Sequence, residues 1–333
     1  MRILVIGGTR FVGRHVVERA VARGHEVTLF HRGLTGVDLF PDLEHRIGDR
    51  NTDLSTLVEG EWDATVDTCA YVPRQVHQLA DALGGRGGHH LLVSSVSVYA
   101  APDGPGIDED APLLELDDPT TEEVTGETYG GLKVLCERAA VERHGPTTVL
   151  VRPTYVVGPD DYSWRFPWWV ARIARGGEVA VPGPPDAPAQ VIDVRDMGEW
   201  MVKLLEDGQS GAFHAASPPP VFTWRDQMEA IAAAVGPPGT RLRWAEPGDV
   251  EAVGIDPGAF PLWSADEPDV WMMAADPSRA FGTGLTPRAL EDTIRDTLAW
   301  TRTVDMPAGT GVTDEQERTL LGRSSHKSAP PPA

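Results

Sequence analysis

Residues 2–13 read Arg-Ile-Leu-Val-Ile-Gly-Gly-Thr-Arg-Phe-Val-Gly, a short apolar run that leads through a glycine turn into a helical pattern. A glycine turn between a first strand and a first helix is typical of dinucleotide binding, because the helix N-terminus offers free N–H groups to a pyrophosphate. Arg10 stands where a G-x-x-G-x-x-G spacing has its middle glycine. The cofactor-binding residues expected in this loop are Gly7, Thr9, Arg10, Phe11, Val12 and Gly13.

The pattern continues outward as alternating strands and helices through the first half of the chain. Strands are expected at 2–6, 26–30, 45–48, 64–69, 90–95 and 147–152, and helices at 11–23, 54–58, 74–83 and 127–144. Several of these strands are continuous apolar runs, which suits a parallel sheet covered on both faces. The sequence therefore predicts an α/β fold with a Rossmann doubly wound parallel sheet.

Beyond residue 152 the pattern loosens, and glycine, proline and tryptophan become frequent. Helices are expected at 168–175, 197–205, 224–235 and 287–302, and strands at 179–181, 190–193, 212–215 and 241–244. We expect a Rossmann domain over 1–157 and a smaller C-terminal α/β substrate domain, interleaved with it, over 158–305. The rest, 306–333, is expected to be a partly disordered tail, with disorder from about Gly322, where Ser and Pro dominate.

Composition narrows the function classes. The formal net charge is −21, and ten of the acids lie between Ala100 and Glu127, which contain no Lys or Arg. Such a chain repels phosphate backbones, so we expect no nucleic-acid partner. No apolar run approaches the roughly 20 residues that span a bilayer, and the first strand leaves no room for a signal peptide, so we expect a cytoplasmic protein without a membrane partner. Two cysteines cannot build a zinc site alone, and no metal site is expected.

The end of the second strand bears on the choice of cofactor. An acidic residue there would bind a ribose 2′-hydroxyl and repel a 2′-phosphate. This chain has His31-Arg32 instead, and Arg32 and Arg10 could both donate to a phosphate. We therefore expect NADP(H) to be preferred, with NAD(H) possible; the alternative is that both arginines are only solvated. Asp49 follows the third strand, where it could accept a hydrogen bond from adenine.

Tyr129 and Lys133 are spaced i and i+4, so they lie on one face of the expected helix. A free tyrosine, with a pKa near 10, is a poor base at neutral pH, but a neighbouring ammonium stabilises the phenolate. Ser94, Ser95 and Ser97 follow the fifth strand, at the sheet edge where ligands bind. The order of glycine turn, serine-ended strand and Tyr–Lys helix favours an acid/base centre.

With these motifs the chain resembles the extended short-chain dehydrogenase/reductases, the NAD-dependent epimerase/dehydratase family, over about residues 1–305. The further motifs are 48–50 (Gly-Asp-Arg), 94–99 (Ser-Ser-Val-Ser-Val-Tyr), 152–159 (Arg-Pro-Thr-Tyr-Val-Val-Gly-Pro) and 190–196 (Gln-Val-Ile-Asp-Val-Arg-Asp). The resemblance implies that Ser95 is the catalytic hydroxyl, that Tyr129 and Lys133 are catalytic and contact the cofactor, and that the protein forms a homodimer. The cofactor contacts that it adds are Arg50, Cys69, Ala70, Pro153 and Val156.

The chain departs from that family in ways that bear on the substrate. Val96-Ser97 stands where the family's dehydratases carry Asp-Glu after the catalytic hydroxyl, so dehydration is disfavoured. Gln190 occupies a region where sugar-nucleotide enzymes often have arginine, and the acidic stretch 100–127 disfavours a dianionic substrate. The substrate-contacting residues expected are Tyr71, Ser97, Trp164, Phe166 and Gln190, with Trp168 and Trp169 read as pocket or as core.

Three functions follow from this pattern. The first is an NAD(P)-dependent reductase or dehydrogenase that acts on a carbonyl or hydroxyl of a small metabolite. The second is a redox-neutral epimerase of a sugar or nucleotide sugar that uses bound NAD(P). The third, a non-enzymatic nucleotide sensor or RNA-binding relative, is suggested by the Thr-Arg-Phe-Val-Gly loop, which is similar to that of a subgroup with an RNA-binding relative. The presence of both Tyr129 and Lys133 argues against it.

Overall fold

The computed structural model describes residues 1–219, 221–263 and 271–327, and the chain divides into two compact units. Unit 1 comprises Met1–Val156, Ile192–Ala216 and Ala275–Pro287. Unit 2 comprises Val157–Val191, Ser217–Ala274 and Arg288–Ala333. The chain therefore returns twice to unit 1 after first leaving it, and the helix expected at 197–205 belongs to unit 1.

Unit 1 is built on a seven-stranded sheet in which every neighbouring pair is parallel, in the order β10-β6-β5-β4-β1-β2-β3. The strands are β1 (Arg2–Ile6), β2 (Glu26–His31), β3 (Glu44–Ile47), β4 (Ala64–Asp67), β5 (His89–Val93), β6 (Val149–Pro153) and β10 (Gly211–Ala215). This is the predicted Rossmann sheet, with β10 added beyond β6. Seven of the expected strands coincide with these apart from shifts at their ends.

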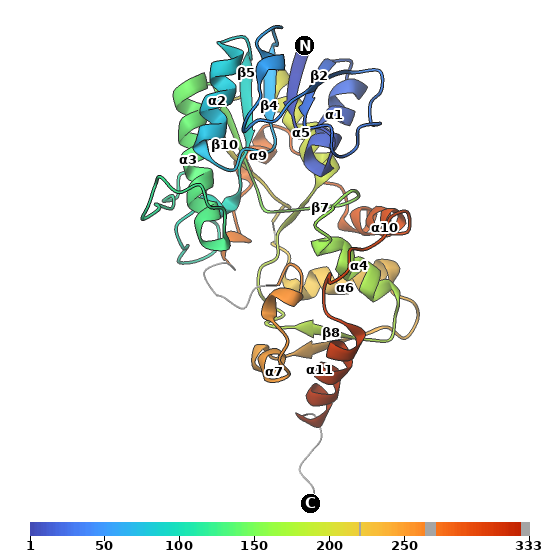
Figure 1. Ribbon diagram of the computed structural model, residues 1–333. Helices are drawn as coiled ribbons and strands as arrows, with labels where there is room; N and C mark the ends of the chain where they lie inside the picture. The colour runs from blue at the N-terminus through green and yellow to red at the C-terminus, as the bar shows by residue number, and fades with distance from the viewer. Residues whose placement is uncertain (220, 264–270, 328–333) are drawn as a thin grey trace, which may run out of the picture. The chain divides into compact units, whose positions relative to one another are not determined.

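The two faces of the sheet are covered by different helices (Figure 1). Side chains alternate along each strand, so Ile3 and Val5 pack against α1 (Phe11–Ala22) and α5 (Val194–Glu206), which contact one another. Leu4 and Ile6 face the opposite side, where α2 (Pro73–Leu83) and α3 (Gly126–His144) pack together.

Unit 2 holds two parallel strands, β8 (Glu178–Pro182) and β11 (Arg241–Ala245), packed with helices. The helices are α4 (Arg165–Ala174), α6 (Trp224–Val235), α7 (Pro247–Ala252), α10 (Leu290–Thr301) and α11 (Asp314–Lys327). The remaining elements within the described residues are η1 (Ser55–Leu57), η2 (Val96–Val98), η3 (Pro257–Ala259), β7 (Tyr155–Val157), β9 (Val191–Asp193) and α9 (Ser278–Gly282). The helix expected at 54–58 is thus a single 3₁₀ turn.

The helix α11 corrects one expectation. Disorder was expected from about Gly322, but residues up to Lys327 are helical, and residues 328–333 lie outside the described residues. A buried ion pair anchors the helix: Arg172 Nε donates to Glu317 Oε2 at 2.7 Å, and the Ala180 amide donates to Glu317 Oε1 at 3.1 Å. The sequence did not predict this helix because its composition is mostly polar. The side chain that anchors it, Glu317, pairs with Arg172, which is distant in the sequence.

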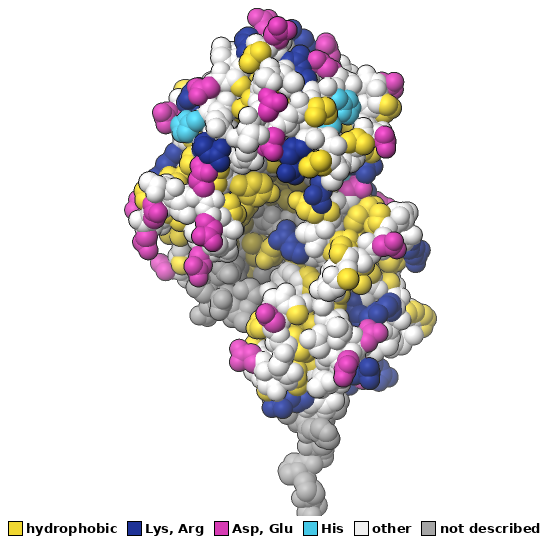
Figure 2. All heavy atoms as spheres, viewed as in Figure 1, with side chains coloured by type: hydrophobic (Ala, Val, Ile, Leu, Met, Phe, Trp, Pro, Cys, Tyr) yellow, Lys and Arg dark blue, Asp and Glu magenta, His cyan; other side chains and the backbone are white. Residues whose placement is uncertain are grey.

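Most acidic side chains of the described residues are at least partly exposed. In Figure 2 acidic and basic side chains are interspersed over the face that is shown. No helix within the described part of the chain is long and apolar enough to cross a membrane.

One buried histidine makes the fold sensitive to acid. His90, at the start of β5, is only 2% exposed, and its ring stacks on that of His144 with centroids 3.9 Å apart. Neither ring nitrogen of His90 has a hydrogen-bond partner among the described residues. Burial, with His144 as a further cause, lowers the pKa of His90 from 6.5 to about 3.

We predict that His90→Phe makes the protein more resistant to acid. The unfolded chain binds a proton at His90 below pH 6.5, whereas the folded protein does not until about pH 3, so the wild-type histidine removes stability as pH falls through this window. The free energy of unfolding of His90→Phe relative to wild type should rise by about 1.4 kcal/mol per pH unit below 6.5. Urea unfolding at neutral pH and near pH 5 measures it.

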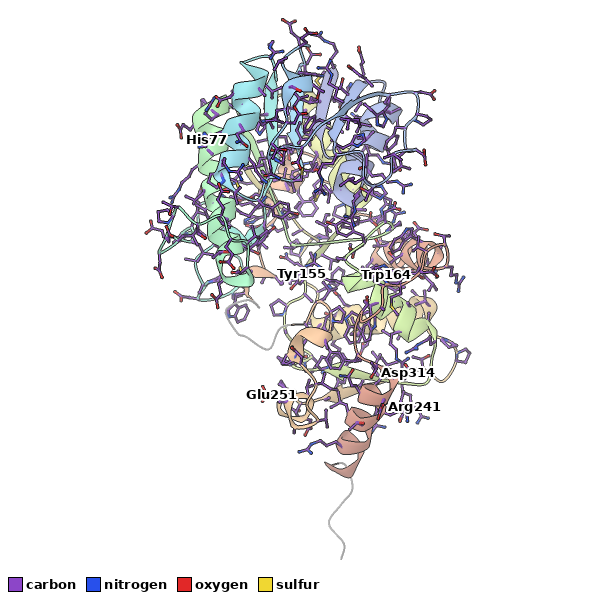
Figure 3. All side chains as sticks on the ribbon, viewed as in Figure 1. His77, Tyr155, Trp164, Arg241, Glu251 and Asp314 are labelled. Atoms are coloured by element: carbon purple, nitrogen blue, oxygen red, sulfur yellow. The ribbon has the colours of Figure 1, made fainter. Side chains whose placement is uncertain are left out.

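The control is His77→Phe, on the partly exposed face of α2 (Figure 3), which should leave the pH dependence unchanged. If the difference in unfolding free energy between His90→Phe and wild type is the same at both pH values, the prediction is wrong.

Candidate active site

The glycine loop after β1 is shaped by close backbone contacts. Gly7 and Gly8 have φ values of +107° and +85°, which disfavour any side chain. A Cβ on Gly13 would lie 2.5 Å from the Gly8 amide nitrogen, and one on Gly8 would lie 2.2 Å from Leu29 Cδ2. The three glycines therefore bring the first turn of α1 directly against the end of β1.

The N-terminus of α1 is available to an anion. Its N-cap residue, Arg10, makes no side-chain capping hydrogen bond, and the first turn contains no acidic residue. The first amides of a helix lack partners within the helix and carry the positive end of its dipole. The glycine cradle and the uncapped helix together fit a dinucleotide pyrophosphate.

The histidine expected near the cofactor is engaged internally. His31 Nδ1 accepts a hydrogen bond from the Gly33 amide at 3.1 Å, and His31 Nε2 lies 2.8 Å from His45 Nδ1. His45 Nε2 must donate to the Phe40 carbonyl, 3.0 Å away, so His31 Nε2 donates to His45 and both rings are neutral. Burial, with His45 as a second cause, lowers the pKa of His31.

Arg32 differs from its neighbour. Its side chain is exposed. Of the His31-Arg32 pair, only the arginine can therefore present a positive charge to a phosphate. The loop that follows returns to the glycine turn, since a Cβ on Gly36 would lie 2.7 Å from the Thr9 carbonyl.

Arg50 is buried against Asp67 at the end of β4. Its terminal nitrogens donate to the two carboxylate oxygens of Asp67 at 2.7 and 2.8 Å, and one of them also approaches Cys69 Sγ at 3.3 Å. Burial opposes ionisation of Asp67, but the guanidinium outweighs it and lowers the pKa of the carboxyl to about 2. Arg50 therefore fixes the strand end that carries Cys69, and Asp49 turns outward to cap the Asn51 amide at 2.9 Å.

Lys133 is a buried cation on the inner side of α3. Its Nζ donates to the carbonyls of Ala70 at 2.9 Å and Val93 at 2.6 Å, and it lies 5.9 Å from the centroid of the Tyr71 ring. These carbonyls come from the loop after β4 and the end of β5, so the ammonium joins two neighbouring strand ends. Tyr129, one turn earlier on α3, is partly exposed at the same edge.

The serine-rich turn after β5 separates the three candidate hydroxyls. Ser95, partly exposed, is the N-cap of η2; its Oγ accepts from the Ser97 amide at 3.1 Å and donates to Ser97 Oγ at 3.0 Å. Ser94 is buried, and its Oγ has no partner among the described residues. Ser95 and Ser97 are therefore the hydroxyls that can reach a ligand.

Gly130 sets how closely α3 approaches this turn. A Cβ at this position would lie 2.1 Å from the Ser97 carbonyl oxygen. The helix residue directly after Tyr129 therefore touches the turn that holds Ser95. Unit 1 thus brings Ser95, Ser97, Tyr129, Lys133 and Tyr71 to the carboxyl edge of one sheet, where the chemistry of a hydroxyl, a phenol and an ammonium can be combined.

The expected substrate residues of unit 2 have a different environment. Trp164 and Phe166 are 5% and 0% exposed, and Trp164 packs on Trp300 with ring centroids 5.4 Å apart. Trp168 and Trp169 are equally buried, and Trp169 Nε1 donates to the Pro261 carbonyl at 2.6 Å. All four side chains are buried in unit 2, and the expectation that Trp164 and Phe166 line a substrate pocket stays a prediction. Gln190 is also fully buried.

Two glycines of the site were not singled out from the sequence. Gly8 was not predicted because the glycine spacing of the motif points to position 10 and not to position 8. Its positive φ nevertheless requires a glycine as much as that of Gly7 does. Gly130, inside a helix, was visible only as a residue with poor helix propensity. A glycine pair within a predicted helix is a signal of close packing that could have been used.

No group of three or more potential metal ligands occurs in the described ranges.

Comparisons with known proteins identify a family and several similar proteins. The model of the NAD dependent epimerase/dehydratase family matches residues 3–215. The dTDP-4-dehydro-6-deoxy-D-allose reductase of Streptomyces bikiniensis is 25% identical over 295 residues, 77% of this chain and 84% of that protein. The UDP-glucuronic acid 4-epimerase of Bacillus cereus, solved in complex with NAD, superposes with a TM-score of 0.66 at 17% identity, over 91% of this chain and 99% of that one.

A further relative carries a different name. The chloroplast stem-loop binding protein of 41 kDa b from Arabidopsis thaliana is 27% identical over 222 residues, 61% of this chain. The match spans only 55% of that relative's length. The likeness thus covers about half of the relative.

Proposed function

The chain belongs to the NAD-dependent epimerase/dehydratase family, and from this premise we propose that it is an NAD(P)-dependent oxidoreductase acting on a carbonyl or hydroxyl of a small metabolite. The observation that carries the proposal is the buried Lys133 ammonium, held by two strand-end carbonyls one helical turn from Tyr129. A buried ammonium without a carboxylate partner costs free energy. That cost is understandable where the charge stabilises a phenolate.

Each residue then has a defined task in the reduction direction. A bound nicotinamide would supply the hydride. Ser95 Oγ, which donates to Ser97 in the free protein, turns its hydrogen to the substrate oxygen and polarises the carbonyl. Tyr129 gives its phenolic proton to that oxygen, and Lys133 stabilises the phenolate left behind until solvent returns a proton. Oxidation of an alcohol runs through the same groups in reverse.

We further propose how the glycine loop and the residues around it hold the cofactor. The pyrophosphate would lie on the α1 N-terminus and Gly7–Gly13, with Asp49 near the adenine and Cys69, Ala70, Pro153 and Val156 near the nicotinamide. Arg32 is exposed at the end of β2, where an acid would select NAD, and Arg10 precedes α1. We therefore propose NADP(H) as the preferred cofactor, with NAD(H) as the alternative.

A redox-neutral epimerase is the second candidate. It is favoured by the family itself and by the likeness to a protein named UDP-glucuronic acid 4-epimerase. It would use the same Ser95, Tyr129 and Lys133 with a cofactor that stays bound. A role like that of the stem-loop binding relative ranks lower, because the net charge of −21 opposes RNA binding.

We predict that Tyr129→Phe and Lys133→Met abolish turnover while NADPH binding persists in Tyr129→Phe. Incubating the protein with the small-molecule fraction of a cell extract and NADPH, and following nicotinamide absorbance, should reveal consumption that falls by about 10²–10⁴-fold in Tyr129→Phe. Lys203→Met is the matched control, because its exposed ion pair with Asp207 is remote from α3. Wild-type turnover in Tyr129→Phe would refute the mechanism. Purified protein that retains nicotinamide and needs none added would support the epimerase.

We also predict that Arg32→Asp shifts the cofactor preference toward NAD. Loss of a charge-assisted contact of about 1.5–3 kcal/mol should raise KM for NADPH by roughly 10–100-fold, and the new carboxylate should improve use of NADH. The same charge change at Arg138, exposed on α3, serves as the control. If Arg32→Asp leaves the KM values for NADPH and for NADH as they are in wild type, the proposed role of Arg32 in selecting NADP(H) is wrong.

A further inference from the structure

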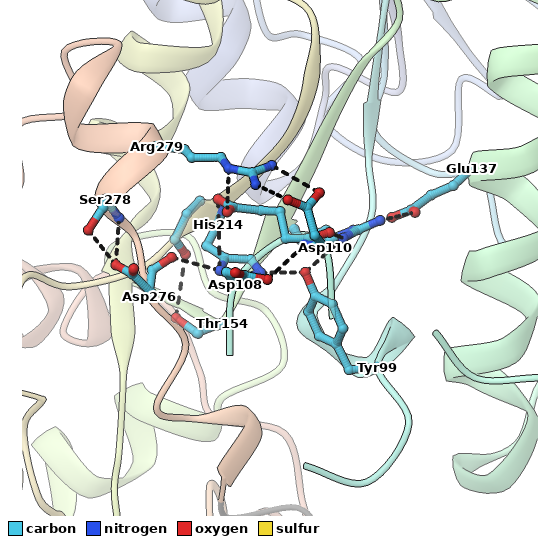
Figure 4. Close-up of polar contacts among 12 residues, drawn as sticks. Tyr99, Asp108, Asp110, Glu137, Thr154, His214, Asp276, Ser278 and Arg279 are labelled. Atoms are coloured by element: carbon cyan, nitrogen blue, oxygen red, sulfur yellow. Dashed lines mark hydrogen bonds and ion pairs between the residues drawn. The ribbon is translucent and has the colours of Figure 1, made fainter. Parts of the chain in front are cut away.

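A network of buried polar groups lies behind the candidate active site in unit 1. Figure 4 shows its contacts around Tyr99, Glu137 and His214. None of these residues was singled out as a site residue from the sequence, and none takes part in the proton transfers described above. Their contacts converge on one side chain, Arg152 of β6, which is 4% exposed.

Arg152 uses its guanidinium on two separate elements. Nε and Nη2 donate to the two carboxylate oxygens of Glu137 at 2.9 and 2.7 Å. Nη1 donates to the Tyr99 hydroxyl at 2.7 Å and to the Glu109 carbonyl at 2.9 Å. The planar fork thus holds a carboxylate on one edge and a phenol on the other, an arrangement that lysine cannot reproduce.

The proton positions around Tyr99 are fixed by the partners. His214 Nδ1 lies 2.8 Å from the Asp276 carbonyl and must donate to it, so Nε2 is an acceptor. The Tyr99 hydroxyl, which accepts from Arg152, therefore donates to His214 Nε2 at 2.5 Å. Burial lowers the pKa of His214 to about 4, which keeps the ring neutral. The hydrogen bonds from Arg152 through Tyr99 and His214 to Asp276 therefore all run in one direction.

Both elements held by Arg152 carry a proposed catalytic group. Glu137 lies on α3, one turn beyond Lys133 and two turns beyond Tyr129. Tyr99 closes the turn η2 that begins at its N-cap, Ser95. The two elements also touch directly, since a Cβ on Gly130 would lie 2.1 Å from the Ser97 carbonyl. The helix is thereby located against the turn at two points, Gly130 and Arg152.

We propose that Arg152 is a positioning residue, which sets Tyr129 and Lys133 relative to Ser95 by holding Glu137 on α3 and Tyr99 at the end of η2. The inference rests on the proposed function, because it concerns the geometry of those three groups. Arg152 itself contacts no reacting atom. A second contact far from Gly130 prevents the helix from pivoting on the turn, and a displacement of about 1 Å can cost a hundredfold in rate.

The chain provides a matched control for the test. Arg172 and Glu317 form another buried ion pair, with Arg172 Nε 2.7 Å from Glu317 Oε2, and their side chains are 9% and 7% exposed. Arg152 and Glu137 are similarly buried, at 5% and 4%. Glu317 lies on α11 in unit 2, whereas α3 and η2 belong to unit 1. Glu137→Gln and Glu317→Gln therefore make the same chemical change, and only the first loosens the proposed alignment.

The experiment has three measurements. They are NADPH consumption with the small-molecule fraction of the cell extract that supports turnover by wild type, NADPH affinity by fluorescence, and the temperature of thermal unfolding. We expect Glu137→Gln and the milder Tyr99→Phe to lower kcat by about tenfold to a hundredfold with NADPH affinity unchanged. Glu317→Gln should keep wild-type kcat even if it unfolds at a similarly lowered temperature. In a Ser95→Ala background, Tyr99→Phe should cost little more, because the group that it positions is already absent.

Equal kcat values for Glu137→Gln, Tyr99→Phe and Glu317→Gln would overturn the inference, as would an undiminished effect of Tyr99→Phe in the Ser95→Ala background. Failure of the proposed function looks different. In that case Ser95→Ala and Tyr129→Phe would themselves keep the wild-type rate.

Discussion

The interaction on which the rest of unit 1 depends is the burial of the Lys133 ammonium against the carbonyls of Ala70 and Val93. It requires α3 to lie directly over the carboxyl edge of the sheet, with the ends of β4 and β5 presented side by side. Their parallel pairing supplies that arrangement. Gly130 removes the side chain that would hold the helix away from the turn after β5. The sheet order and the packing of α3 therefore place one buried charge a helical turn from Tyr129.

The buried charges of unit 1 fall into two kinds. Asp67 with Arg50 and Glu137 with Arg152 are bidentate pairs in which each ion has an opposite partner. Such pairs fix backbone geometry, and breaking one leaves an uncompensated charge that costs several kcal/mol. Lys133 has no carboxylate partner within the described residues, only carbonyl dipoles. This contrast separates charges that support the site from the one that can act on a phenolate.

Much of this arrangement was readable from the sequence. Continuous apolar runs located the strands of the sheet, and the glycine turn and the Tyr–Lys spacing located the loop and the helix, because these signals are local. The Arg152 network was not readable, since Tyr99, Glu137 and His214 meet only after folding. The same is true of α11, whose anchor Glu317 finds Arg172 far away in sequence. Trp164 and Phe166 are buried within unit 2, and their expected place in a substrate pocket stays a prediction.

The most direct test of the account is a crystal structure of the protein with NADPH bound. The account predicts the pyrophosphate on the glycine loop, Lys133 Nζ within hydrogen-bonding distance of the nicotinamide ribose, and Ser95 and Tyr129 both facing the reactive face of the nicotinamide. A complex in which the nicotinamide lies away from Tyr129, or in which Lys133 makes no contact with the ribose, would contradict the claim that these three side chains form the reaction centre.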